Sequence, residues 1–211
     1  MIPHPFPIFL DLTDRPCVVI GSGPEAERKI AALRRAGAEV RCAAEFDPAL
    51  LRNATLVMVA GASLATGEAV ARAARSLGIP VNVMDEPGLC TFLMPAIVDR
   101  APVVVAISTG GAAPALARLL RIRLERLLPA RLGDLATLAA RFRPLVRRRL
   151  AHIETRKRFW SGVFTGEVAR LALDGEPAAG ALADTLDAAA RQGGGDASSA
   201  VPLPYSKSSA V

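Results

Sequence analysis

The run Cys17-Val-Val-Ile-Gly-Ser-Gly-Pro-Glu-Ala-Glu-Arg-Lys29 decides the fold of this chain. It opens with a short apolar stretch, Cys17 to Ile20, that is typical of a buried strand, and a helical pattern follows. Between the two lies a Gly-x-Gly-x-x-Ala turn formed by Gly21, Gly23 and Ala26. A glycine turn between a strand and a helix is typical of a nucleotide-binding unit, whereas the glycines alone would be weak evidence.

This turn predicts a binding site for the pyrophosphate of a dinucleotide. Gly21 permits a tight bend, and Gly23 lets the pyrophosphate approach without a Cβ in the way. Free N–H groups at the start of the helix face the anion. The predicted cofactor contacts in the turn are Gly21, Ser22, Gly23, Pro24, Glu25 and Ala26. A tight strand-to-helix turn without a ligand is the alternative.

Apolar runs and helical patterns alternate after the turn. Further strands are expected at residues 39–44, 56–61 and 81–84, and helices at residues 47–53 and 66–77. This alternation predicts an α/β fold with a parallel, doubly wound sheet. The apolar segment at residues 5–12 is expected to pair with or cover the sheet edge.

The carboxyl ends of parallel strands meet at one edge of a sheet, where ligands bind. Gly21, Glu45, Gly61 and Asp85 each stand at such an end, so we expect them to converge on one crevice. Glu45, which follows Ala44, lies near the spacing of the acidic residue that binds ribose hydroxyls in dinucleotide folds. A carboxylate that is merely solvated is the alternative.

Asp85 is the strongest candidate for chemistry. It follows an apolar strand and opens the crevice where a nicotinamide ring would lie, so its carboxylate could act as a general base with a pKa tuned by burial. The alternative is that Asp85 caps the following loop. Asn82, which precedes it in the strand, could bind a substrate or hold the strand end.

The pattern changes after Asp85. Two β-runs at residues 96–98 and 103–108 lead into a second glycine-rich turn and an amphipathic helix at 115–128. That turn could bind a carboxylate or phosphate through backbone N–H groups, or be a plain connection. Its residues are Ser108, Thr109, Gly110 and Gly111. Further helices are expected at 132–150, 152–164 and 178–191, and the tail at 192–211 is expected to be disordered or a linker.

Composition limits the partners of the chain. Of the 211 residues, 51% are hydrophobic and 22% are charged, so a packed core is expected. The net charge is +6, which favours an acidic partner. The candidates are nucleic acid, an anionic membrane surface and a polycarboxylate or phosphate ligand. Aromatic residues make up only 4%, too few for stacking on bases. The basic runs at 147–149 and 156–158 lack a helix-turn-helix pattern around them.

No metal site is predicted, because His4 and His152 are isolated and no other residues have metal-ligand spacing. Cys17, Cys42 and Cys90 are expected to be buried free thiols of a reducing compartment. The N-terminus lacks the basic region of a signal peptide, and no apolar run is long enough to span a bilayer. We therefore expect a cytosolic protein.

Several separate segments, in order, resemble the dehydrogenase and ferrochelatase half of siroheme synthase, a family that also includes stand-alone precorrin-2 dehydrogenases. The resemblance runs from about Pro7 to Phe164. It rests on Val18-Val-Ile-Gly-Ser-Gly-Pro-Glu-Ala-Glu-Arg-Lys29, Val81-Asn-Val-Met-Asp85, Phe92-Leu-Met-Pro-Ala-Ile97 and Val105-Ala-Ile-Ser-Thr-Gly-Gly111.

The resemblance implies NAD-dependent oxidation of precorrin-2 to sirohydrochlorin in siroheme biosynthesis. In some members the same site then inserts ferrous iron, which is a substrate. Asp85 matches the aspartate proposed as the base for both reactions, and the turn at 108–111 matches a motif near the substrate pocket. Thr109 stands where some members carry a regulatory phosphoserine.

The resemblance also implies an interlocked homodimer. Its parts would be an NAD-binding Rossmann domain at 1–94, a dimerisation region at 95–129, a small helical domain at 130–191 and the tail at 192–211. A tetrapyrrole with many carboxylates accounts for the arginine excess without nucleic acid or a membrane. The alternatives are a dehydrogenase without chelatase activity and an NAD(H)-sensing regulator that binds DNA through its basic helices.

This chain departs from the family at the adenosine side of the pocket. Gly61-Ala62-Ser63 stands where members commonly carry Thr-Asp, and the segment between the second and third strands is short. The preference between NAD and NADP therefore stays open.

Overall fold

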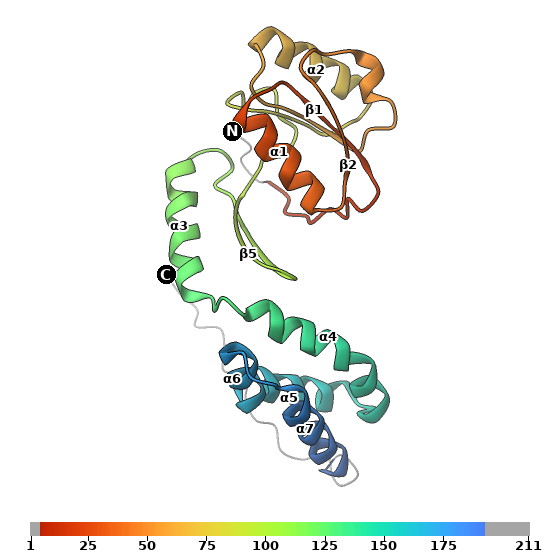
Figure 1. Cartoon of the computed structure of the whole chain (residues 1–211), viewed down its shortest axis with the longest axis vertical. Coiled ribbons are helices and arrows are strands. Elements are labelled where there is room, and N and C mark those ends of the chain that lie inside the picture. Colours follow the sequence, from red (N-terminus) through yellow and green to blue (C-terminus); the bar gives the residue numbers. More distant parts are fainter. Residues whose placement is uncertain (1–4, 193–211) are drawn as a thin grey trace. The chain divides into compact units, whose positions relative to one another are not determined.

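A computed structural model describes residues 5–192 (Figure 1). The chain divides into two compact units. The first unit comprises the chain up to Ile97 together with Ala106–Arg123, and the second unit comprises Val98–Val105 together with the chain from Leu124 onward. The tail predicted at 192–211 lies, after residue 192, outside the described residues.

The first unit is built on a parallel sheet of four strands, as the sequence predicted. The structure gives their order as β2-β1-β3-β4. The strands are β1 (Pro16–Ile20), β2 (Glu39–Ala43), β3 (Leu56–Val59) and β4 (Val81–Val83). β1 and β3 lie in the centre and are almost wholly buried, which explains their continuous apolar sequences. β2 lies at one edge and has no fully buried residue. Cys42 is exposed there, so the prediction that it is buried is wrong.

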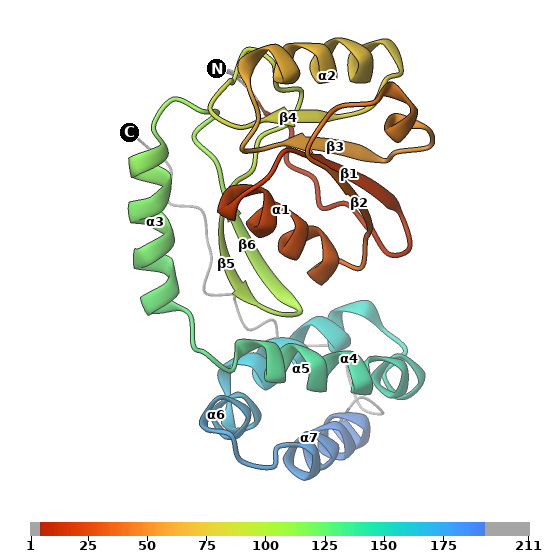
Figure 2. The ribbon, with the colours of Figure 1, turned by 45° about the horizontal axis from the view of Figure 1, so that its top comes forward.

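Helices cover both faces of this sheet (Figure 2). Alternate residues of each strand point to opposite faces, so each face has apolar side chains that a helix can cover. α1 (Pro24–Arg35) packs on the face that carries Val19. α2 (Leu64–Ser76) and the short 3₁₀ helix η1 (Pro48–Leu51) pack on the face that carries Val18. The sheet is therefore doubly wound.

Local capping sets where these helices begin. α2 starts earlier than predicted, because Ser63 Oγ accepts a hydrogen bond from the Thr66 N–H at 3.2 Å. Asp47 similarly begins η1 by accepting from the Ala49 N–H at 2.8 Å.

The prediction that residues 5–12 pair with or cover the sheet edge is wrong. The structure gives this segment no strand, and the side chains of Phe6, Ile8, Phe9 and Leu10 are exposed. Only Leu12 is buried, against the face that α1 covers. The proline ring nitrogens at positions 5 and 7 have no hydrogen to donate to a strand ladder, which disfavours pairing.

A hairpin and a helix follow the sheet. β5 (Ala96–Arg100) and β6 (Val103–Ile107) form a two-stranded sheet, and two residues join them. So short a connection requires antiparallel strands. α3 (Pro114–Leu127) begins after the second glycine-rich turn.

Between residues 128 and 192, the second unit contains four helices around their own core. They are α4 (Leu132–Arg149), α5 (Ile153–Thr165), α6 (Glu167–Asp174) and α7 (Ala179–Gln192), and the largest core side chains include Val146, Phe159, Leu182 and Leu186. The sequence did not predict α6, which is short and lies between Gly166 and Gly175. Gly175 ends it in the left-handed conformation, with φ of 85°.

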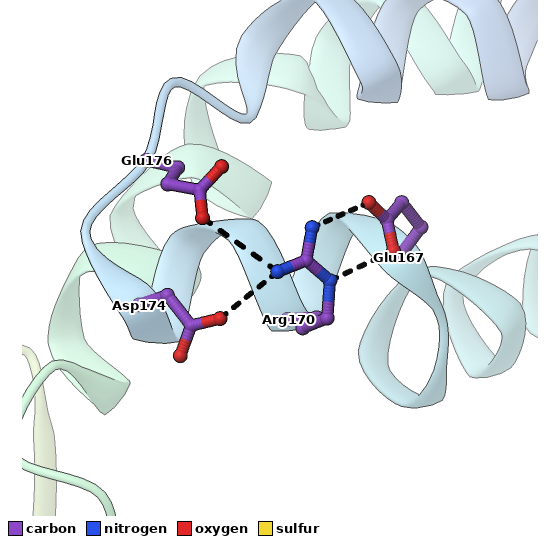
Figure 3. Close-up of polar contacts among 4 residues, drawn as sticks. All are labelled: Glu167, Arg170, Asp174 and Glu176. Atoms are coloured by element: carbon purple, nitrogen blue, oxygen red, sulfur yellow. Dashed lines mark hydrogen bonds and ion pairs between the residues drawn. The ribbon is translucent and has the colours of Figure 1, made fainter.

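Ion pairs hold α6 to the turn that follows it. Arg170 pairs with Glu167 at 2.7 Å, with Asp174 at 3.1 Å and with Glu176 at 3.6 Å (Figure 3). The hydrogen bond and charge of Arg170 lower the pKa of the Glu167 carboxyl. These side chains are exposed, so the network contributes little to stability.

Two arginines of the basic runs have structural partners in the second unit. Arg149 forms an ion pair with Asp187, which joins α4 to α7. Arg156 Nη1 donates to the carbonyl oxygens of Leu150 at 2.8 Å and Ala151 at 2.6 Å, just after the end of α4. Part of this positive charge therefore organises the helices themselves.

Candidate functional site

The loops after β1 and β3 pack directly against each other. A Cβ on Gly21 would lie 1.9 Å from the carbonyl oxygen of Ala60, and a Cβ on Gly61 would lie 2.0 Å from that of Ser22. Both glycines also have positive φ, 120° and 67°. Close backbone packing therefore requires glycine at both positions.

Gly23 faces open space. Its φ is 83°, and a Cβ built on it would meet nothing within 4 Å. α1 begins at the next residue, and its N-terminus has no side-chain cap, so the first-turn N–H groups are available to a ligand. Glu25 lies in this turn, but its charge is paired with that of Arg28. The turn thus fits the pyrophosphate of a dinucleotide.

The four strand ends lie along one edge of the sheet. Gly21 N–H donates to the Ala43 carbonyl at 2.9 Å, Ala60 N–H to Ile20 at 3.0 Å, and Met84 N–H to Val59 at 3.0 Å. Residues 44 and 45 follow β2 at this edge, and both are exposed. The ends of β2, β1, β3 and β4 are therefore in register.

A cavity of about 490 Å³ opens at the end of β4, within the first unit. Of the predicted site residues, Asn82, Asp85, Ser108, Thr109 and Gly111 line it. Those that do not line it are Gly21, Ser22, Gly23, Pro24, Glu25, Ala26, Ala44, Glu45, Gly61 and Gly110. The strand-end residues thus share an edge of the sheet, but only Asp85 among them borders this cavity.

Asp85 occupies an unusual backbone conformation. Its φ is 63°, in the left-handed region that residues with a Cβ seldom adopt. The side chain is exposed, so the expectation that burial surrounds this carboxylate is wrong. Among residues 5–192 the carboxylate accepts no hydrogen bond, so it does not cap the loop.

The loop around Asp85 is tied back to β4 by Cys90. The Val83 N–H donates to Cys90 Sγ at 3.2 Å, and the thiol lies 3.2 Å from the Val83 carbonyl oxygen and 3.3 Å from that of Glu86. Asn82 Nδ2 donates to the Phe92 carbonyl at 3.0 Å. Asn82 thus holds the segment that follows β4, one of the two roles predicted for it.

The side chains of the second glycine turn make hydrogen bonds within the turn. Ser108 Oγ accepts from Gly110 N–H at 3.1 Å, and Thr109 Oγ1 accepts from Ala113 N–H at 3.1 Å. Gly110 and Gly111 have φ of 63° and 83°. These hydrogen bonds hold the conformation of the turn that leads into α3, beside the cavity.

Three cationic side chains that line the cavity were not among the predicted site residues: Lys29, Arg118 and Arg121. The sequence could have indicated that Lys29 faces the interior, because it lies on the same helical stripe as Ala26 and Leu33, which are buried in α1. Burial lowers the pKa of the Lys29 ammonium, and the charge of Arg28 lowers it further. The Asp85 and Cys90 side chains act in the opposite direction.

Two other classes of site have no support in the described part of the chain. No three His, Cys, Asp or Glu side chains gather there as a metal-binding group. No helix there is both long enough and apolar enough to cross a membrane.

Three protein families match successive parts of the chain. Residues 8–96 match a putative NAD(P)-binding family, residues 102–127 the central region of sirohaem biosynthesis proteins, and residues 131–189 the sirohaem synthase dimerisation region. The three matches follow one another in chain order and leave only short gaps.

Curated relatives are similar over the same region. The siroheme synthase of Methylobacillus flagellatus is 44% identical over 191 residues, which cover 81% of this chain and 41% of that protein. The siroheme synthase of Methylococcus capsulatus is 45% identical over 209 residues, which cover 88% and 44%. The chain therefore spans about two-fifths of the length of these relatives.

One solved structure has the same fold. It is described as SirC, precorrin-2 dehydrogenase, and superposes with a TM-score of 0.64 at 19% identity. The match covers 87% of this chain and 99% of that one.

Proposed function

Since the chain belongs to the family formed by the N-terminal region of siroheme synthases, we propose that it oxidises precorrin-2 to sirohydrochlorin with NAD. The observation that carries the proposal is the cavity at the end of β4, where the Asp85 carboxylate has no hydrogen bond from the described residues. A predicted dinucleotide site lies along the same edge of the sheet.

The dinucleotide would bind at the first glycine turn. Its pyrophosphate would occupy the open space beside Gly23 and meet the N–H groups of α1. Glu45, exposed just after β2, would bind the ribose hydroxyls, and its negative charge favours NAD over NADP. When bound, the nicotinamide ring supplies the acceptor for a hydride.

The oxidation removes two electrons and two hydrogens from precorrin-2. One carbon–hydrogen bond would break with its electron pair, and a bound dinucleotide would supply the acceptor for that hydride. The second hydrogen leaves as a proton, and Asp85 accepts it before passing it to solvent. The exposed position of Asp85 suits that exchange. Cys90 ties the backbone on either side of Asp85, which holds this residue in the loop that lines the cavity.

Iron insertion is a second candidate reaction at the same carboxylate. Ferrous iron would enter as a substrate and bind to the pyrrole nitrogens of sirohydrochlorin, while Asp85 accepts the displaced protons. Incubating the protein with sirohydrochlorin and ferrous iron tests this. Siroheme formation faster than the protein-free rate supports iron insertion. An equal rate would mean that the protein acts as a dehydrogenase without chelatase activity.

The enzyme is proposed to act as a homodimer in the cytosol. Residues 95–129 expose several large apolar side chains, which a second copy would cover. They are Ile97, Val104, Leu116, Leu119 and Leu127. The match of residues 131–189 to a dimerisation region supports the same state. The three free thiols suit a reducing compartment.

An anaerobic assay with precorrin-2 and NAD tests the proposed oxidation through the absorbance of sirohydrochlorin. Gly23→Asp is the matched variant, because its carboxylate would stand in the space assigned to the pyrophosphate. We expect turnover by the wild type and an NAD affinity at least about tenfold weaker in the variant, as for a lost charge-assisted contact. No sirohydrochlorin from the wild type would refute the proposal, and unchanged NAD affinity would refute the placement of the pyrophosphate.

A further inference from the structure

Two walls of the cavity carry positive charge. Lys29 comes from α1, whereas Arg118 and Arg121 come from α3. Apolar side chains fill much of the lining between them, including Met84, Leu93, Met94 and Ile107. The cavity thus combines an apolar interior with cations from separate elements.

Lys29 is a charged residue on the apolar stripe of α1. It is half-buried on the stripe of α1 that packs toward the sheet, beside Ala26. Among residues 5–192 its ammonium makes no hydrogen bond or ion pair, and burial lowers its pKa. A partly desolvated cation without a close partner costs free energy. An anionic ligand group would offset that cost.

Arg118 and Arg121 follow one face of α3. They are three positions apart, so their side chains are neighbours on the helix surface. Ala117, which lines the same cavity, is buried. Arg118 is exposed, and among the described residues it too makes no hydrogen bond or ion pair. Its guanidinium is therefore available for bidentate binding of a carboxylate.

We propose that Lys29 and Arg118 bind two carboxylates of the tetrapyrrole from separate walls of the cavity and so hold the macrocycle against Asp85. The inference rests on the proposed function and assigns the residues that recognise its substrate. The carboxylates around the edge of the apolar macrocycle are opposite in charge to the cations that line the apolar cavity. Glu86, which also lines the cavity, would repel a carboxylate placed beside it.

Binding of uroporphyrin, a stable tetrapyrrole polycarboxylate, tests this without turnover. Its fluorescence is titrated with wild type, Lys29→Gln and Arg118→Gln. Arg34→Gln in α1 and Arg123→Gln in α3 are matched controls, since each removes one charge from the same helix outside the cavity. We expect each cavity variant to weaken binding by about tenfold, the scale of a charged hydrogen bond at a partly exposed site, and the controls to bind like wild type.

The methyl ester of uroporphyrin completes the test. With its carboxylates blocked, it should bind wild type and both cavity variants equally weakly, and Lys29→Arg should restore much of the affinity for the free acid. Wild-type affinity in both cavity variants would refute the assignment of Lys29 and Arg118 alone. If the wild type bound no uroporphyrin while its fold was intact by circular dichroism, both this inference and the proposed substrate class would fail.

Discussion

Asp85 holds a backbone conformation that costs roughly 1–2 kcal/mol for a residue with a Cβ. The surrounding loop maintains it, through the contacts of the Cys90 thiol with Val83 and Glu86. Such conformations persist where neighbouring structure fixes them, and they gather at functional sites. The same loop places Asp85 in the lining of the cavity.

Lys29 gives a prediction about stability and pH. The pKa of the Lys29 ammonium is lowered from 10.5 in the folded protein. At pH values between the folded pKa and 10.5, the unfolded chain therefore binds more protons than the folded protein does. The free energy of unfolding rises with pH over this range. Lys29→Met removes this contribution. We expect the variant to be more stable than wild type at neutral pH, with the difference shrinking as pH approaches about 10.5.

Urea unfolding at a series of pH values measures the Lys29 effect. A Lys29→Met protein that is less stable at neutral pH would mean that the lysine supports the fold. The interpretation of Lys29 as a ligand-binding cation would then lose its physical basis.

At the level of elements, the contact between the β1 and β3 loops yields a second prediction. Gly61→Ala would force a Cβ to within 2.0 Å of the Ser22 carbonyl oxygen, so the loops must separate. Gly78→Ala is the control, because Gly78 has a similar φ of 69° but nothing within 4 Å. We expect Gly61→Ala to cost about 1–3 kcal/mol more than Gly78→Ala, the usual cost of overpacking.

Chemical denaturation of the two glycine variants measures this difference. Equal costs would show that the left-handed backbone, rather than the packing of the two loops, requires glycine at position 61.

The sequence predicted the elements that have strong local patterns. Buried apolar runs identified β1, β3 and β4, and the glycine turn located the start of α1. The missed helix α6 has only eight residues, and it is held by packing and by exposed ion pairs of Arg170. The ion pairs are local to the helix and weak, so most of its stability comes from tertiary packing, which the local pattern does not report.

The candidate site was predictable in part for a similar reason. Topology brings strand ends together, so Asp85 could be assigned to the edge of a parallel sheet from sequence. Lys29 was missed because charged residues in a helix are usually solvated, although its position on the apolar stripe of α1 marked it. The resemblance indicated that the turn at 108–111 lies near the pocket, and three of its residues line the cavity. The cations of α3 that line the same cavity were not predicted, because the amphipathic pattern of that helix does not show which of its arginines face a site.

For the whole molecule, the exposed apolar side chains of α3 predict the oligomeric state. Leu119 is 44% exposed, and an aspartate there would be costly to bury between two copies. We expect Leu119→Asp to convert the proposed dimer to a monomer at micromolar concentration, as measured by size-exclusion chromatography with light scattering.

Leu77→Asp is the control for the dimer. Leu77 is also exposed, at 60%, but it lies at the end of α2, outside residues 95–129. This variant should keep the mass of the wild type. A dimeric Leu119→Asp protein would show that the exposed face of α3 is not the contact between copies.

The most direct measurement compares wild type and Asp85→Asn under anaerobic conditions with saturating NAD, following sirohydrochlorin formed from precorrin-2. The amide keeps the size of the side chain but cannot accept the proton, so we expect dehydrogenation to fall at least roughly a hundredfold while NAD affinity is unchanged. Near-full turnover by Asp85→Asn would remove this carboxylate from the reaction and with it the account of the cavity as the catalytic site.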